Sequence, residues 1–113
     1  MQAMSTNPAV PAQWRRRRDE KERRLVAARK IASGKIIPTG DIVAALEVLI
    51  APGDRVALEG DNQKQADFLS RSLARTSPER LHDLHMIIPS VSRAEHLDLF
   101  EAGIARKLDF SFA

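Results

Sequence analysis

The chain has 113 residues and a mass of 12.6 kDa, which suits one small domain with a single core. It contains no cysteine, so disulfide scaffolds, thiol nucleophiles and Cys-ligated zinc or iron–sulfur sites are excluded, and we expect a cytoplasmic protein. No apolar run approaches the roughly 20 residues that a membrane span needs. The formal net charge of +3 is unevenly distributed. The segment from Trp14 to Lys30 contains nine Lys or Arg and three Asp or Glu, whereas the rest of the chain contains nine basic and twelve acidic residues.

The start of the chain divides into a leader and a helical segment. Residues 1–13 carry two prolines and no charge, which predicts a disordered leader. Helix formers with a modest apolar face predict a helix over residues 19–32, with Gly34 as its stop. Asp41 is a candidate N-cap for a second helix over residues 42–50. We therefore treat 14–50 as an N-terminal helical segment with a basic start.

The Arg15–Arg18 run has two interpretations. A basic arm attracts phosphate, on nucleic acid or on another phosphate-rich partner. Alternatively, the run is the solvated start of a helix, in which Asp19, Glu20 and Glu22 pair with Lys or Arg three or four positions away. The frequency of such charge runs favours the solvated helix, and the basic binding protein is the alternative function.

Beyond residue 51 the pattern alternates between strands and helices. The first predicted elements are a strand at 54–59, a helix at 63–75 with Ala66, Leu69 and Leu73 on its apolar face, and a helix start at Ser77-Pro78-Glu79. A strand at 84–88 follows, and then a helix that begins at a Ser92/Glu95 capping box, buries Leu97, Phe100 and Ile104, and has a C-terminal cap at Gly103. The last predicted element is a strand through Leu108, Phe110 and Phe112.

This order predicts an α/β fold: a partial parallel sheet with covering helices, preceded by the N-terminal helices. Three strands are few for such a sheet, and the third reaches Ala113 with an apolar face to cover. We therefore expect residues 51–113 to be an incomplete α/β domain of a longer chain, or one that a partner completes.

The candidate site is the loop after the first strand, Glu59-Gly60-Asp61-Asn62-Gln63. Ligands in open α/β sheets bind at the carboxyl ends of strands, beside the free amides of the next helix. Gly60, Asp61, Asn62 and Gln63 are thus candidates for ligand binding. The simpler interpretation, that Asp61 or Asn62 only caps the helix, is favoured on spacing alone, because such caps are common. No GxGxxG or GxxxxGK[ST] motif is present to indicate a phosphate loop.

Neither a metal site nor a serine hydrolase is indicated. His82 and His85 are three residues apart, but one precedes the predicted strand and the other lies in it, so they need not converge. His96 stands near Glu95 and Asp98 on the last helix without an HExxH pattern. No GxSxG motif places a serine nucleophile on a strand–helix turn.

The segment GDRVALEGDNQKQADFLSRSLA, followed by LHDLHMIIPSVSRAEHLDLFEAGIARKLDFSFA, resembles the start of the malonate decarboxylase alpha subunit. The resemblance covers roughly residues 14–113 and is most specific in EGDNQKQADFLSR, HDLHM and EHLDLFE. The family's chain is several times longer and is similar in fold to the coenzyme A transferases. The resemblance therefore implies that this chain is the N-terminal portion of such a subunit.

The implied activity is transfer of the acyl-carrier thioester from acetate to malonate, which yields malonyl-carrier and acetate in malonate breakdown. The implied partners are the acyl carrier subunit, the other malonate decarboxylase subunits, malonate and acetate. No cofactor is bound directly, since the thiol belongs to a phosphoribosyl-dephospho-coenzyme A group on the carrier. The related citrate lyase alpha subunit, which uses the same carrier on another carboxylate, remains an alternative.

The resemblance also bears on catalysis. Related coenzyme A transferases use a glutamate that attacks the thioester to form an anhydride. Their motif for it lies later in the chain, so the catalytic residue is expected downstream of Ala113 and the 113 residues alone are expected to be inactive. Those enzymes commonly carry a Gly-Gly-Phe turn after the first strand, where this chain has Glu59-Gly60-Asp61-Asn62-Gln63. Glu59 is therefore not assigned as the nucleophile. With the resemblance in view, our hypothesis is that Gly60, Asp61, Asn62 and Gln63 line the substrate or thioester pocket.

Overall fold

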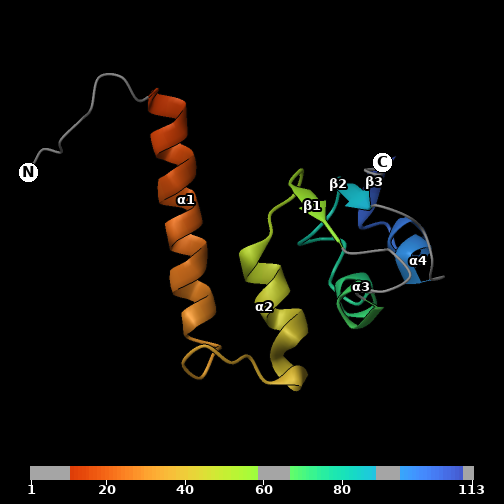
Figure 1. Ribbon diagram of the computed structural model, residues 1–113, viewed down its shortest axis with the longest axis horizontal. Helices are drawn as coiled ribbons and strands as arrows, with labels where there is room; N and C mark the ends of the chain where they lie inside the picture. Colours follow the sequence, from red (N-terminus) through yellow and green to blue (C-terminus); the bar gives the residue numbers. More distant parts are fainter. Residues whose placement is uncertain (1–10, 59–66, 89–94, 111–113) are drawn as a thin grey trace, which may run out of the picture.

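The computed structural model describes residues 11–58, 67–88 and 95–110 (Figure 1). In chain order the elements are α1 (Ala12–Arg29), η1 (Thr39–Asp41), α2 (Ile42–Leu49), β1 (Arg55–Ala57), α3 (Asp67–Ala74), β2 (Leu84–Ile88), α4 (Glu95–Glu101) and β3 (Ala105–Phe110). Helices that follow one another in the chain also contact one another, from α1 through α4. Within the described ranges, no helix has both the length and the apolar character that crossing a membrane requires.

The three strands form one parallel sheet in the order β1-β2-β3, which confirms the predicted α/β architecture. The predicted strand at 84–88 matches β2, whereas β1 is shorter than the predicted 54–59. β3 begins at Ala105, earlier than the alternation from Leu108 indicates. The reason is a register shift: Leu84 pairs with Ala105 but His85 pairs with Lys107, so the intervening residue interrupts the alternation.

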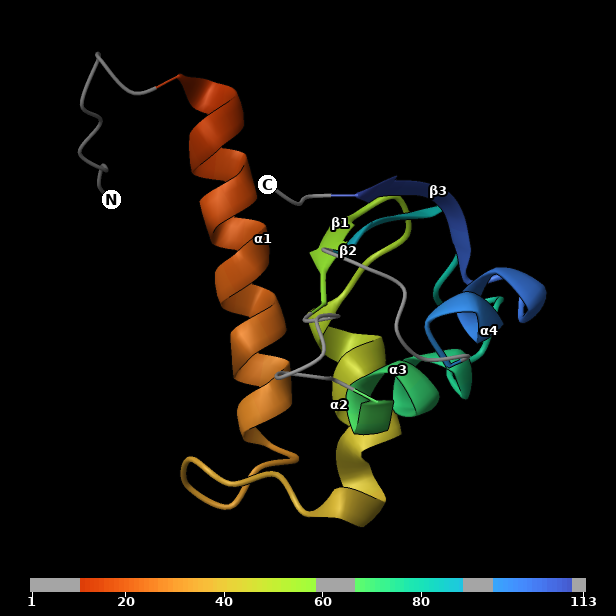
Figure 2. The ribbon, with the colours of Figure 1, turned by 45° about the vertical axis from the view of Figure 1, so that its right-hand side comes forward.

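One face of the sheet forms the core. β2 alternates, with Leu84, Met86 and Ile88 fully buried. These side chains pack with Leu73 of α3 and Leu99 of α4, so the two helices cover this face (Figure 2). On the other face the register aligns Arg55, His85 and Lys107 in one row, and the first and last of these are exposed.

The buried faces of α3 and α4 differ from the predicted ones. Leu69 and Leu97 were expected in the core but are 39% and 47% exposed. α4 instead buries Leu99, and α3 buries Ser70 and Ser72 beside Leu73. The prediction for α3 failed because small polar side chains form part of the surface through which α3 contacts the core. A prediction based only on the apolar residues therefore selects the wrong face of the helix. The predicted burial of Ile104 is confirmed, and Phe100 is half-buried against the core.

The N-terminal predictions need correction. α1 begins at Ala12, well before the predicted residue 19, so residues 12–13 of the predicted leader are helical; residues 1–10 lie outside the described part. The Pro11 carbonyl accepts from the amides of Trp14 and Arg15, and the arginines that follow favour a helix. α1 ends at Arg29, before the predicted Ala32.

Asp41 does not cap α2 through its side chain. It ends the short 3₁₀ turn η1, and its carboxylate makes no cap hydrogen bond. The Ser77 helix start is present as a single turn: the amides of Arg80 and Leu81 donate to the Ser77 carbonyl, and the Ser77 hydroxyl accepts from the Glu79 amide. The Ser92/Glu95 capping box involves residues outside the described part.

Gly103 terminates α4 as the sequence predicts. Its amide donates to the Phe100 carbonyl, and the Ile104 amide donates to the Leu99 carbonyl, which is the Schellman pattern. Gly103 has φ +80°, a conformation that costs a residue with a Cβ atom. Ile104 and Leu99 are both buried, so the same turn supplies two core residues.

We predict that Gly103→Ala lowers the free energy of unfolding by about 1 kcal/mol, because the left-handed backbone conformation is less favourable for alanine than for glycine. No atom lies within 4 Å of the position that a Cβ would take, so steric overlap adds nothing. Gly40→Ala is the matched control, since Gly40 also has open space and lacks a positive φ. Urea denaturation measures both; equal stability of the two variants would contradict the assignment.

Candidate functional site

α1 is attached to the body with little apolar contact. Ala28 is its one buried residue, and Trp14 and Val26 are 57% and 48% exposed. The helix lies beside α2 in both ribbon views (Figures 1 and 2). Polar contacts must therefore contribute to its position.

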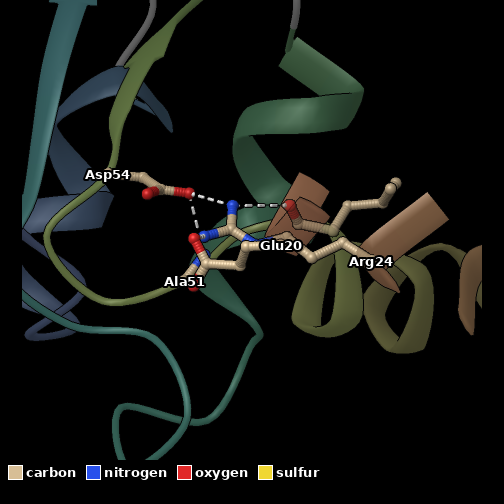
Figure 3. Close-up of polar contacts among 5 residues, drawn as sticks. Glu20, Arg24, Ala51 and Asp54 are labelled. Carbon is tan, nitrogen blue, oxygen red and sulfur yellow. Dashed lines mark hydrogen bonds and ion pairs between the residues drawn. The ribbon is translucent and has the colours of Figure 1, made fainter. Parts of the chain in front are cut away.

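Arg24 supplies these contacts (Figure 3). Its Nη1 donates to Asp54 Oδ2 at 2.7 Å and lies 3.3 Å from the Leu49 carbonyl oxygen. Its Nη2 lies 3.1 Å from Glu20 Oε2, one turn earlier on α1. The same Asp54 oxygen accepts the Ala51 amide at 2.9 Å. One guanidinium thus joins α1 to the end of α2 and to the loop that enters β1.

A groove of about 560 Å³ opens beside this contact, between α1 and the start of β1. Its lining residues are Arg17, Glu20, Lys21, Arg24, Gly53, Asp54 and Arg55. Both carboxylates in this set are engaged by Arg24. Arg17, Lys21 and Arg55 make no ion pair with any other residue in the described ranges, so the groove is cationic.

The groove is suited to binding and not to covalent chemistry. Its side chains are guanidinium, ammonium and engaged carboxylate groups, with no hydroxyl, thiol or imidazole among them. Arg17 and Arg55 can present paired N–H donors to an oxyanion, and Lys21 adds a point charge. The arrangement therefore favours an anion with several acceptor oxygens.

The histidines of the second strand region are paired separately. His82 Nδ1 lies 2.8 Å from Asp83 Oδ2, and His85 Nε2 lies 2.7 Å from Asp109 Oδ2. The hydrogen bond with His82, assisted by the charge of Arg106, lowers the pKa of Asp83 below its ordinary value. In the described part of the chain, no three His, Cys, Asp or Glu residues are grouped to hold a metal ion.

The predicted site residues Gly60, Asp61, Asn62 and Gln63 lie outside the described residues, so their role stays a prediction. The structure places β1 directly before them, with Leu58 buried at its carboxyl end. The cationic groove lies at the opposite, amino end of β1. The basic run was apparent in the sequence but the groove was not predicted, although Arg17, Lys21 and Arg24 share one helix face at spacings of four and three.

Comparison with known proteins places the chain within one family. The family model described as malonate decarboxylase, alpha subunit, transporter, matches residues 13–113. The acetyl-S-ACP:malonate ACP transferase of Malonomonas rubra is 44% identical over 100 residues, which are 88% of this chain and 18% of that protein. The chain therefore spans about a fifth of this relative's length.

Two crystal structures are similar in fold and sequence. A malonate decarboxylase alpha subunit from Acinetobacter baumannii has 67% identity and a TM-score of 0.83, over 88% of this chain and 18% of its own. A Pseudomonas malonate decarboxylase hetero-tetramer in complex with malonate has 70% identity and a TM-score of 0.83, over 92% of this chain and 19% of the matched chain.

The Arg24 contact predicts how α1 responds to substitution. Arg24→Ala should raise the amide exchange rates of α1 severalfold, because the helix keeps only Ala28 as a buried anchor. Exchange in β2 should stay unchanged. Arg29→Ala, which removes an exposed arginine at the last residue of α1, is the control. Hydrogen exchange read by mass spectrometry tests this, and equal α1 protection in both variants would refute the anchoring role.

Proposed function

The chain belongs to the malonate decarboxylase alpha-subunit family, and from this premise we propose that it forms the N-terminal part of an acyl-carrier-protein transferase. The proposed reaction exchanges the acyl group on a carrier thiol: acetyl-carrier and malonate give malonyl-carrier and acetate. The observation that carries the proposal is the 44% identity to a protein named for this transfer. The shared fold with two malonate decarboxylase structures supports it.

The proposed partners follow from the same relatives. The Pseudomonas relative is a hetero-tetramer in complex with malonate, which supports other decarboxylase subunits and malonate as partners. The acyl carrier, with its phosphoribosyl-dephospho-coenzyme A thiol, and acetate complete the proposal. A cytoplasmic location is part of it and accords with a cysteine-free composition.

Within such an enzyme this segment would supply binding surface and scaffold. The chain continues from the carboxyl end of β1 into the segment that contains Gly60–Gln63, and parallel sheets generally bind ligands at the carboxyl ends of their strands. We propose that Gly60, Asp61, Asn62 and Gln63 line the carboxylate or thioester pocket. The reacting glutamate would belong to a segment beyond Ala113, as the family resemblance implies.

A chimaera tests this proposal. Residues 13–113 would replace the matching segment of the Acinetobacter baumannii alpha subunit, which is 67% identical in this region. We expect the chimaera, assembled with its partner subunits, to release acetate from acetyl-carrier on addition of malonate, and the 113-residue chain alone to release none.

The Asn62→Ala change in the same chimaera should lower the rate, and Gln13→Ala, at an exposed position in the first turn of α1, should leave it unchanged. A correctly assembled chimaera without malonate-dependent turnover would contradict the proposed function. Unchanged kinetics in Asn62→Ala would remove the loop from the pocket while leaving the transferase assignment in place.

A further inference from the structure

The cationic groove between α1 and β1 has no role assigned to it in the proposed transfer reaction. We propose that it binds a compact, multiply charged phosphate anion, held between Arg17 and Lys21 on α1 and Arg55 at the start of β1. The groove lies at the amino end of β1. The proposal rests on the residues that line the groove and does not require the proposed transferase function.

Helix geometry brings the cations of α1 to one wall of the groove. Arg17, Lys21 and Arg24 follow one another at four- and three-residue spacing, which places them on one face of the helix. Arg24 is the innermost of the three, with its side chain 19% exposed and engaged by two carboxylates. Arg17 and Lys21 make no ion pair with another described residue, so their charges are available to a ligand.

The opposite wall adds Arg55 from the sheet. Because three positive charges from two separate elements face one groove, they repel one another across it. A bound anion removes this repulsion and links α1 to β1 a second time, in addition to the Arg24–Asp54 contact. Ligand binding should therefore stabilise the docked position of α1.

The shape of the groove favours a small anion over a nucleic acid. Its volume of about 560 Å³ lies within the range of small-molecule sites. Along α1 the basic residues are interrupted by Asp19, Glu20 and Glu22, so the helix offers no unbroken run of cations to a long phosphate backbone. Phosphate groups offer several oxygens to guanidinium forks, and two linked phosphates match a site with cations on both walls.

The experiment is calorimetric titration of the 113-residue chain with inorganic pyrophosphate, with chloride adjusted to hold ionic strength constant. We expect saturable one-site binding. The double variant R17Q/K21Q should bind about tenfold more weakly or worse, because two charge-assisted contacts are lost. R29Q/K30Q removes the same charge from exposed positions outside the groove and should bind as the parent does. Far-UV circular dichroism checks that each variant keeps its helices.

Hydrogen exchange provides a second readout, in which saturating pyrophosphate should slow amide exchange in α1 of the parent but not of R17Q/K21Q. Equal weakening in both double variants would show general charge attraction and overturn the site. Absence of saturable heat would overturn it too. So would salt-sensitive binding of duplex DNA without binding of pyrophosphate, which would identify the basic helix as a nucleic-acid arm.

Discussion

The position of the N-terminal helix depends on one ion pair, between Arg24 and Asp54. α1 buries a single alanine, so the apolar contacts that usually dock a helix are nearly absent. Arg24 replaces them with a 2.7 Å contact to a carboxylate that is itself fixed by the Ala51 amide. Because both side chains are partly buried, the pair is shielded from water more than an ordinary surface pair.

This pair also determines the charge of the surface around it. Glu20 and Asp54 are the two carboxylates of the groove, and both are engaged by Arg24. Arg17 and Lys21 of α1 therefore leave positive charge facing the amino end of β1. The carboxyl end of the same strand leads toward the segment proposed for acyl transfer.

The sequence predicted the fold more fully than the site. The LHMII run of β2 and the cap at Gly103 were predictable because each depends on neighbouring residues. The start of β3 was missed because the shift after Ala105 breaks the alternation. The groove was missed because it depends on Asp54 meeting a side chain 30 positions earlier. Periodicity carries no information about such a pairing, whereas family resemblance gave the proposed function without the local geometry.

A double-mutant cycle on Arg24 and Asp54 tests the account most directly. The free energies of unfolding of Arg24→Ala, Asp54→Ala and the double variant give the coupling between the two side chains. A partly buried, charge-assisted hydrogen bond predicts a favourable coupling of about 1–2 kcal/mol. The same cycle with Arg29→Ala in place of Arg24→Ala should be additive. A coupling between Arg24 and Asp54 within about 0.3 kcal/mol of zero would contradict the claim that this pair holds the helix in place.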